Sequence, residues 1–171
     1  LAGQRGVTRV AFLFRPGTLV ERLVAAQAMA EGIVLACYDG GARKTAGPGP
    51  TWLEHADIRI ADAPDEAPAA IERGRVLGEC TNQARSLANG RANGLTPRAF
   101  AQRATDIAVG TGLSVEVLDE PNIAALKMGM LLGVARGSQE PPRVLILRHE
   151  PREAPGHGVL GLRGKGITLG N

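Results

Sequence analysis

The stretch VTRVAFLF, residues 7–14, is a run of apolar and β-branched residues that predicts a largely buried strand. A helix is predicted after it, to about Tyr38, because Thr18 and Glu21 fit a capping box. Its apolar stripe has helical spacing and consists of Leu23, Ala26, Ala30, Val34 and Cys37. Residues 40–56 are predicted to form an exposed loop, and DIRIA, residues 57–61, a short strand. This order of strand, helix and strand predicts an α/β protein.

The same alternation continues through the rest of the chain. A long helix is predicted over residues 67–88, where it would join two domains, with a buried face of Leu77, Cys80, Ala84 and Leu87. Thr96 followed by Pro97 predicts the start of another helix, which Gly110 or Gly112 would end. The remaining predicted elements are a strand at 113–117, a short helix within 120–129, a covered central strand at 143–148 and a last strand within 157–164.

Composition excludes several classes of protein. The formal net charge is +3, the arginines form no basic run, and aromatic residues are only 3% of the chain, so nucleic-acid binding is not expected. No stretch approaches eighteen apolar residues, so a membrane span is not expected either. Cys37 and Cys80 are interpreted as small buried thiols in a reducing cytoplasm, since two cysteines make no disulfide framework and no cysteine-rich zinc site. The first residues show no initiator Met and no signal pattern, which predicts a chain that begins mid-protein.

Gly164-Lys165-Gly166 raises the question of a phosphate-binding loop. The pattern G-x-x-x-x-G-K-[ST] requires glycine where this chain has Val159, and serine or threonine where it has Gly166. Both requirements fail, and no segment of helical length follows. A phosphate-binding loop is therefore excluded here.

Histidine, serine and cysteine side chains give no stronger candidate. His149 and His157 could bind a metal with Glu150 or Glu153, but this Pro- and Gly-rich connection is the usual place for solvated charges. His55 lies in another predicted loop, and Asp119-Glu120 is interpreted as a helix cap. The serines Ser86, Ser114 and Ser138 lack a G-x-S-x-G elbow, and a buried Cys80 would disfavour its thiolate. No catalytic residue is assigned.

Four motifs in order resemble the cytosolic leucyl aminopeptidase family, the M17 metallopeptidases. They are AEGIVLACYDGGARKT (30–45), NQARSLANGRANGLTPRAFA (82–101), the segment from LSVEV to LRHE (113–150) and GLRGKGIT (161–168). The third contains a strand, a helix, a Gly-x-Leu-Leu-x-Val loop and a Gly-Ser-x-Glu-Pro-Pro-Arg turn. Together the motifs extend over about four fifths of the chain.

The resemblance implies a two-domain α/β enzyme. Residues 1–64 would be the C-terminal part of a macro-like N-terminal domain, and residues 65–171 a linker helix followed by the beginning of the catalytic domain. The family removes N-terminal residues from peptides, is hexameric and cytoplasmic, and uses two divalent metal ions, Mn²⁺ or Zn²⁺. Peptides are then the expected substrates, with neither a nucleic acid nor a membrane as a partner.

Little of that metal site is present in this sequence. Lys165 matches the family's metal-site lysine, whereas Gly170 stands where the family has a metal-binding aspartate and Leu169 where it has phenylalanine. Arg163 replaces an apolar residue, and Gly90-Arg91 replaces Glu-Pro or Thr-Pro. The family's remaining metal ligands and its catalytic arginine have no counterpart here. The resemblance thus predicts an internal fragment, truncated at both ends, that is inactive alone and does not retain the metals.

Two further hypotheses belong to other classes of function. A non-catalytic assembly module could bind subunits of a full-length relative. Nucleotide or ADP-ribose binding through the macro-like half ranks last, because that half shows no glycine-rich phosphate loop.

Overall fold

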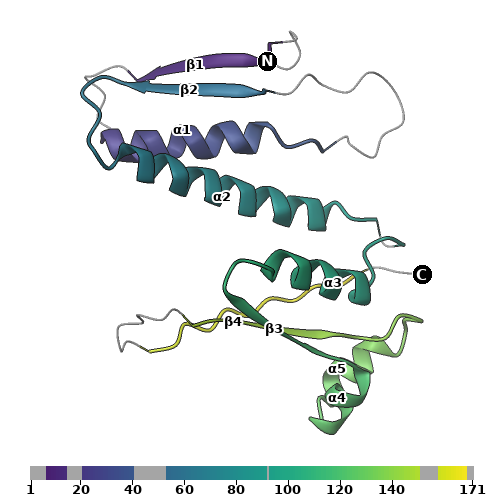
Figure 1. Ribbon diagram of the computed structural model, residues 1–171. Coiled ribbons are helices and arrows are strands. Elements are labelled where there is room, and N and C mark those ends of the chain that lie inside the picture. The colour runs from purple at the N-terminus through teal and green to yellow at the C-terminus, as the bar shows by residue number, and fades with distance from the viewer. Residues whose placement is uncertain (1–6, 15–20, 41–52, 92, 151–157, 169–171) are drawn as a thin grey trace. The chain divides into compact units, whose positions relative to one another are not determined.

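The computed structural model describes residues 7–14, 21–40, 53–91, 93–150 and 158–168. The chain divides into two compact units, residues 1–89 and residues 90–171. In the described residues, helices and strands follow each other in the order β1–α1–β2–α2 in the first unit and α3–β3–α4–α5–β4 in the second (Figure 1). The predicted mixture of helices and strands is therefore confirmed.

The first unit begins with a parallel strand–helix–strand motif. Strands β1 (Arg9–Phe14) and β2 (His55–Ile60) pair in parallel, with Arg9 opposite His55 and Phe14 opposite Ile60. Helix α1 (Arg22–Ala36) connects them and lies along one face of the pair (Figure 1). The strand predicted at 7–14 is confirmed, but it is only partly buried, because Phe12 is 38% and Leu13 66% exposed.

Helix α1 starts later than the capping box predicts. Its first helical hydrogen bond runs from Ala25 N to Glu21 O at 2.9 Å, which makes Glu21 the N-cap, and the Glu21 side chain makes no capping bond. Thr18 lies outside the described residues, as does most of the loop predicted at 40–56. His55 and Ala56 were predicted in that loop but belong to strand β2, where they pair with Arg9 and Val10. From the predicted stripe, Ala26 and Ala30 are buried, which confirms the face that α1 turns inward.

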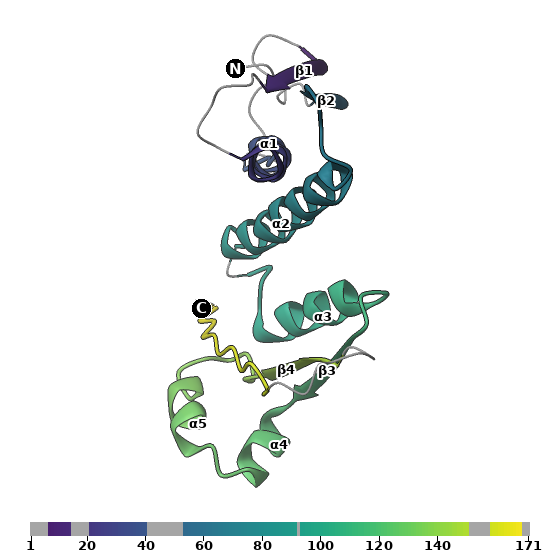
Figure 2. The same ribbon diagram turned by 90° about the vertical axis from the view of Figure 1, so that its left-hand side faces the viewer.

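Helix α2 (Ala67–Ala88) has the predicted bounds and packs along α1 (Figures 1 and 2). Its buried face, however, consists of the small residues Ala67, Ala70, Gly74 and Gly78. The predicted face of Leu77, Cys80, Ala84 and Leu87 was wrong: Leu77 is 43% exposed, and Cys80 and Ala84 are exposed as well. The physical reason is that the glycines let the two helix backbones come closer than leucine side chains would allow.

The second unit contains an antiparallel strand pair and three helices. Strand β3 (Leu113–Leu118) pairs with β4 (Val144–His149), with Leu113 opposite His149 and Leu118 opposite Val144. Helix α3 (Pro97–Ala108) begins where predicted, since Thr96 Oγ1 accepts a hydrogen bond from Ala99 N at 3.2 Å. Gly110 and Gly112 have φ of +78° and +75°, and they form the turn between α3 and β3.

Three predictions for the second unit need correction. The segment expected as a loop, residues 129–134, forms helix α5 (Gly129–Ala135) after helix α4 (Glu120–Ala125), because its residues are mostly good helix formers. Strand β4 is not a covered central strand: among the described residues it pairs only with β3, and Leu147 is 48% exposed. Residues 158–164 form no strand, since no described strand pairs with them, and backbone pairing is what stabilises an extended segment.

Candidate functional site

Lys165 is the one residue for which the family resemblance predicts a role in a metal site. It lies within residues 158–168, a glycine-rich segment without helix or strand, and its side chain is exposed. The neighbouring Arg163 is exposed too, while Leu169 and Gly170 lie outside the described residues. Within the described ranges, no group of three or more His, Cys, Asp or Glu side chains is placed to hold a metal ion. The part of the chain that the structure describes therefore brings no carboxylate cluster to Lys165.

The other titratable candidates also remain separate. His149 and Glu150 are exposed at the end of β4, whereas Glu153 and His157 lie outside the described residues. His55 Nε2 lies 3.0 Å from Asp57 Oδ1, and both side chains are about half exposed on one face of β2. Such a contact, between side chains two residues apart on an exposed strand, forms no enclosed site.

Two of the polar candidates, Asp119 and Ser138, accept hydrogen bonds from backbone amides and so have structural roles. Asp119 Oδ1 accepts from Asn122 N at 3.1 Å at the start of α4, which confirms the predicted helix cap. Ser138 Oγ accepts from Glu140 N at 3.1 Å in the turn after α5. Ser86 and Ser114 are exposed, and neither lies at a strand-to-helix elbow. Cys80 is exposed, which corrects its predicted burial, and Cys37 is half-buried.

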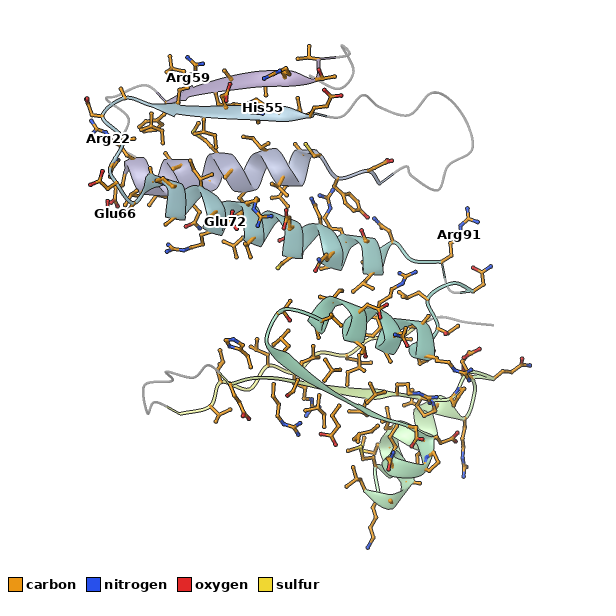
Figure 3. All side chains as sticks on the ribbon, viewed as in Figure 1. Arg22, His55, Arg59, Glu66, Glu72 and Arg91 are labelled. Atoms are coloured by element: carbon orange, nitrogen blue, oxygen red, sulfur yellow. The ribbon has the colours of Figure 1, made fainter. Side chains whose placement is uncertain are left out.

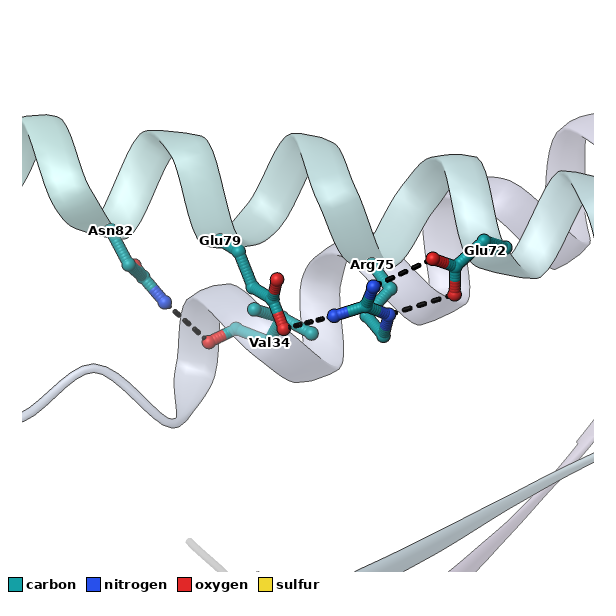
Figure 4. Close-up of polar contacts among 5 residues, drawn as sticks. All are labelled: Val34, Glu72, Arg75, Glu79 and Asn82. Atoms are coloured by element: carbon teal, nitrogen blue, oxygen red, sulfur yellow. Dashed lines mark hydrogen bonds and ion pairs between the residues drawn. The ribbon is translucent and has the colours of Figure 1, made fainter. Parts of the chain in front are cut away.

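Polar side chains of α2 hold the last turn of α1. Asn82 Nδ2 donates to Val34 O at 2.8 Å (Figure 4), and Arg85 Nη1 donates to Leu35 O at 3.0 Å. The Arg85 guanidinium also lies 3.9 Å from the centre of the Tyr38 ring, whose hydroxyl accepts from Asn89 Nδ2 at 2.9 Å. These donors add to the backbone hydrogen bonds that Val34 O and Leu35 O accept from Cys37 N at 3.2 Å and Tyr38 N at 3.3 Å, and Arg85 brings a positive charge to the negative end of the helix. The cluster fixes one helix against the other.

Arg75 links two carboxylates on the exposed side of α2 (Figure 4). It binds Glu72 through two hydrogen bonds of 2.7 Å and 2.6 Å, and it also pairs with Glu79. The hydrogen bonds from Arg75 hold the pKa of Glu72 below its ordinary value of 4.5, and the same contacts raise the pKa of Arg75. Figure 3 shows Glu72 on this helix among the other side chains of the first unit. All three groups are about half exposed and bind one another on the surface of α2, which is the arrangement of a surface ion-pair network.

A shallow depression of about 560 Å³ lies where β2 ends and α2 begins. Its apolar lining includes Ile58, Ile60, Pro68 and Ile71, and Arg59 and Asp65 contribute charged groups. The carboxyl end of a parallel strand is a common place for ligands in α/β proteins. Strand β1 ends at the same edge of the sheet, with Phe14 opposite Ile60, and the next residues of the chain, 15–20, lie outside the described residues. The depression therefore assigns no ligand.

Sequence reasoning did not single out Asn82 and Arg85 individually. Their signal is their position: each lies three or four residues from another polar residue on α2, next to the small-residue face that includes Gly78. Recognising that signal requires knowing that Gly74 and Gly78 face α1. The spacing of Leu77 and Leu87 along α2 predicts instead that a different face of the helix is buried.

Comparison with known proteins identifies the family. The sequence profile described as "Cytosol aminopeptidase family, catalytic domain" matches residues 82–170, which is about half of the chain. That match includes Lys165 and begins within α2. The strand–helix–strand motif of the first unit, β1–α1–β2, lies before the matched residues.

Curated relatives agree with this match. A probable cytosol aminopeptidase of Solibacter usitatus is 46% identical over 112 residues, which are 66% of this chain and 23% of the relative. A probable cytosol aminopeptidase of Koribacter versatilis is 35% identical over 168 residues, covering 95% of this chain and 31% of the relative. The chain thus spans about a quarter to a third of the length of these relatives.

Solved structures show the same relationship. The bottromycin maturation enzyme BotP in complex with Mn has a TM-score of 0.75 and 30% sequence identity, covering 86% of this chain and 30% of BotP. A mutant of tomato leucine aminopeptidase has a TM-score of 0.78 and 25% identity, covering 89% of this chain and 32% of that protein. The fold, the motifs and the profile agree, and the chain belongs to the cytosol aminopeptidase family.

Proposed function

We propose that this chain is the middle part of a metal-dependent aminopeptidase, an enzyme that hydrolyses N-terminal residues from peptides. The observation that carries the proposal is the catalytic-domain match over residues 82–170, which includes the glycine-flanked Lys165. The named relatives are cytosol aminopeptidases, and the alternative, a non-catalytic assembly module derived from an aminopeptidase, is not favoured.

We propose Lys165 as a metal ligand of the intact enzyme, with two divalent ions such as Mn²⁺ or Zn²⁺. The manganese in the BotP complex supports a divalent metal in this family. The residues described for this chain do not suffice to hold two such ions, because dications need several carboxylate, imidazole or thiolate ligands and no cluster of three such groups is present in the described ranges. No chemical step is therefore assigned to this chain, and we expect the chain alone to be inactive.

The domain division and the setting of the enzyme are also proposals. Residues 1–64 would belong to a macro-like domain, and residues 65–171 to the linker helix and the start of the catalytic domain; the parallel motif β1–α1–β2 supports the first part. Peptide substrates, a hexameric assembly and a cytoplasmic location follow from the family resemblance. The structure describes no helix that is both long enough and apolar enough to span a membrane.

A chimera tests the proposed role of the catalytic-domain segment. First, the hydrolysis of leucine p-nitroanilide by the Solibacter usitatus relative is measured with Mn²⁺. The segment of that relative that corresponds to residues 82–168 of this chain is then replaced by those residues. We expect the chimera to retain metal-dependent hydrolysis, and Lys165→Met in the chimera to reduce kcat/KM by about a hundredfold or more, the scale of losing a group that supports the transition state.

The matched control in the chimera is Arg163→Leu, two residues away on the same exposed segment. We expect this variant to keep the activity of the chimera. A chimera that folds but hydrolyses nothing, or equal losses for the two variants, would argue against the proposal.

A further inference from the structure

We draw no further inference here: the strongest candidate, the exposed apolar stripe that Leu77, Cys80 and Ala84 form on helix α2, is an unpartnered helix face, and nothing in the described part of the chain shows what covers it.

Discussion

Gly74 of helix α2 lies directly against the backbone carbonyl of Gln27 in helix α1, and a Cβ atom at Gly74 would be 2.2 Å from that oxygen. One turn later, a Cβ at Gly78 would be 2.8 Å from Val34 Cβ. Real Cβ atoms do not approach a backbone oxygen so closely, so any side chain at position 74 must push the helices apart. The two glycines thus set the distance between α1 and α2.

Gly74→Ala should destabilise the first unit by about 1–2 kcal/mol. Alanine favours a helix over glycine by up to about 1 kcal/mol, but overpacking against a rigid backbone costs about 1–3 kcal/mol. Gly78→Ala should cost less, since the nearest atom, Val34 Cβ, would be 2.8 Å away and the nearest backbone oxygen, Glu31 O, 3.1 Å away. Urea unfolding followed by far-UV circular dichroism measures both.

Gly32→Ala is the matched control for this prediction. Gly32 lies inside α1 and is exposed, and a Cβ atom added there would have no neighbour within 4 Å. Alanine there should stabilise by about 0.4–1 kcal/mol. Equal effects of alanine at positions 32 and 74 would contradict the close approach of the helices.

Asn82→Ala should lower the free energy of unfolding by about 1 kcal/mol, because it removes the hydrogen bond to Val34 O. Asn82→Asp should cost more, since it replaces the donor by a negative charge at the C-terminal end of α1. Gln83→Ala, at the exposed neighbouring position, should change the free energy of unfolding by less than about 0.5 kcal/mol. If the Asn82→Asp variant were as stable as the parent chain, the role of Asn82 as a cap would be refuted.

The Glu72–Arg75 pair should give a stability contribution that depends on pH and salt. Because Arg75 lowers the pKa of Glu72 in the folded state, the contribution is present above pH 4.5 and is lost as the pH falls through the lowered pKa. Both groups are exposed, so the contribution is small and screened by salt.

Comparing the parent chain with Glu72→Gln at low salt checks this pH dependence. The parent should be the more stable at pH 7, and the difference should close at acid pH and in 1 M NaCl. Glu54→Gln, at an exposed position for which the described residues show no ion pair, should give no such pattern. If the difference in stability between the parent chain and Glu72→Gln grew as the pH fell, the predicted contribution of the Glu72–Arg75 pair would be contradicted.

Thr96→Ala should weaken the first turn of α3 by about 1 kcal/mol, since the Thr96 hydroxyl caps the Ala99 amide. Thr96→Ser keeps the hydroxyl and should keep most of that stability. Hydrogen exchange of the amides in residues 97–108 measures the effect locally. Equal protection in the alanine and serine variants would show that the cap contributes nothing.

Local signals in the sequence predicted most helix and strand positions. The bounds of α2 and the caps at Thr96 and Asp119 could be predicted because each depends on a few neighbouring residues. The family could be recognised because its motifs, including the segment around Lys165, occur in order along the chain.

Features that depend on tertiary packing could not be predicted in the same way. The face that α2 buries depends on how closely α1 approaches Gly74, and leucine spacing carries no information about that distance. Residues 158–164 contain the apolar residues Val159, Leu160 and Leu162, but a strand also needs a partner, which the local sequence does not specify. The same holds for the metal site, because ligands far apart in sequence must be brought to Lys165.

We propose that Lys165 belongs to a two-metal peptidase site of the intact enzyme, and within the described ranges no cluster of metal-binding side chains accompanies it. The most direct measurement is hydrolysis of leucine p-nitroanilide by the purified 171-residue chain with added Mn²⁺, beside an active full-length cytosol aminopeptidase. We predict no release of p-nitroaniline above that of a Lys165→Met variant. Metal-dependent turnover that is abolished by a chelator and by Lys165→Met would contradict the expectation that the chain alone is inactive.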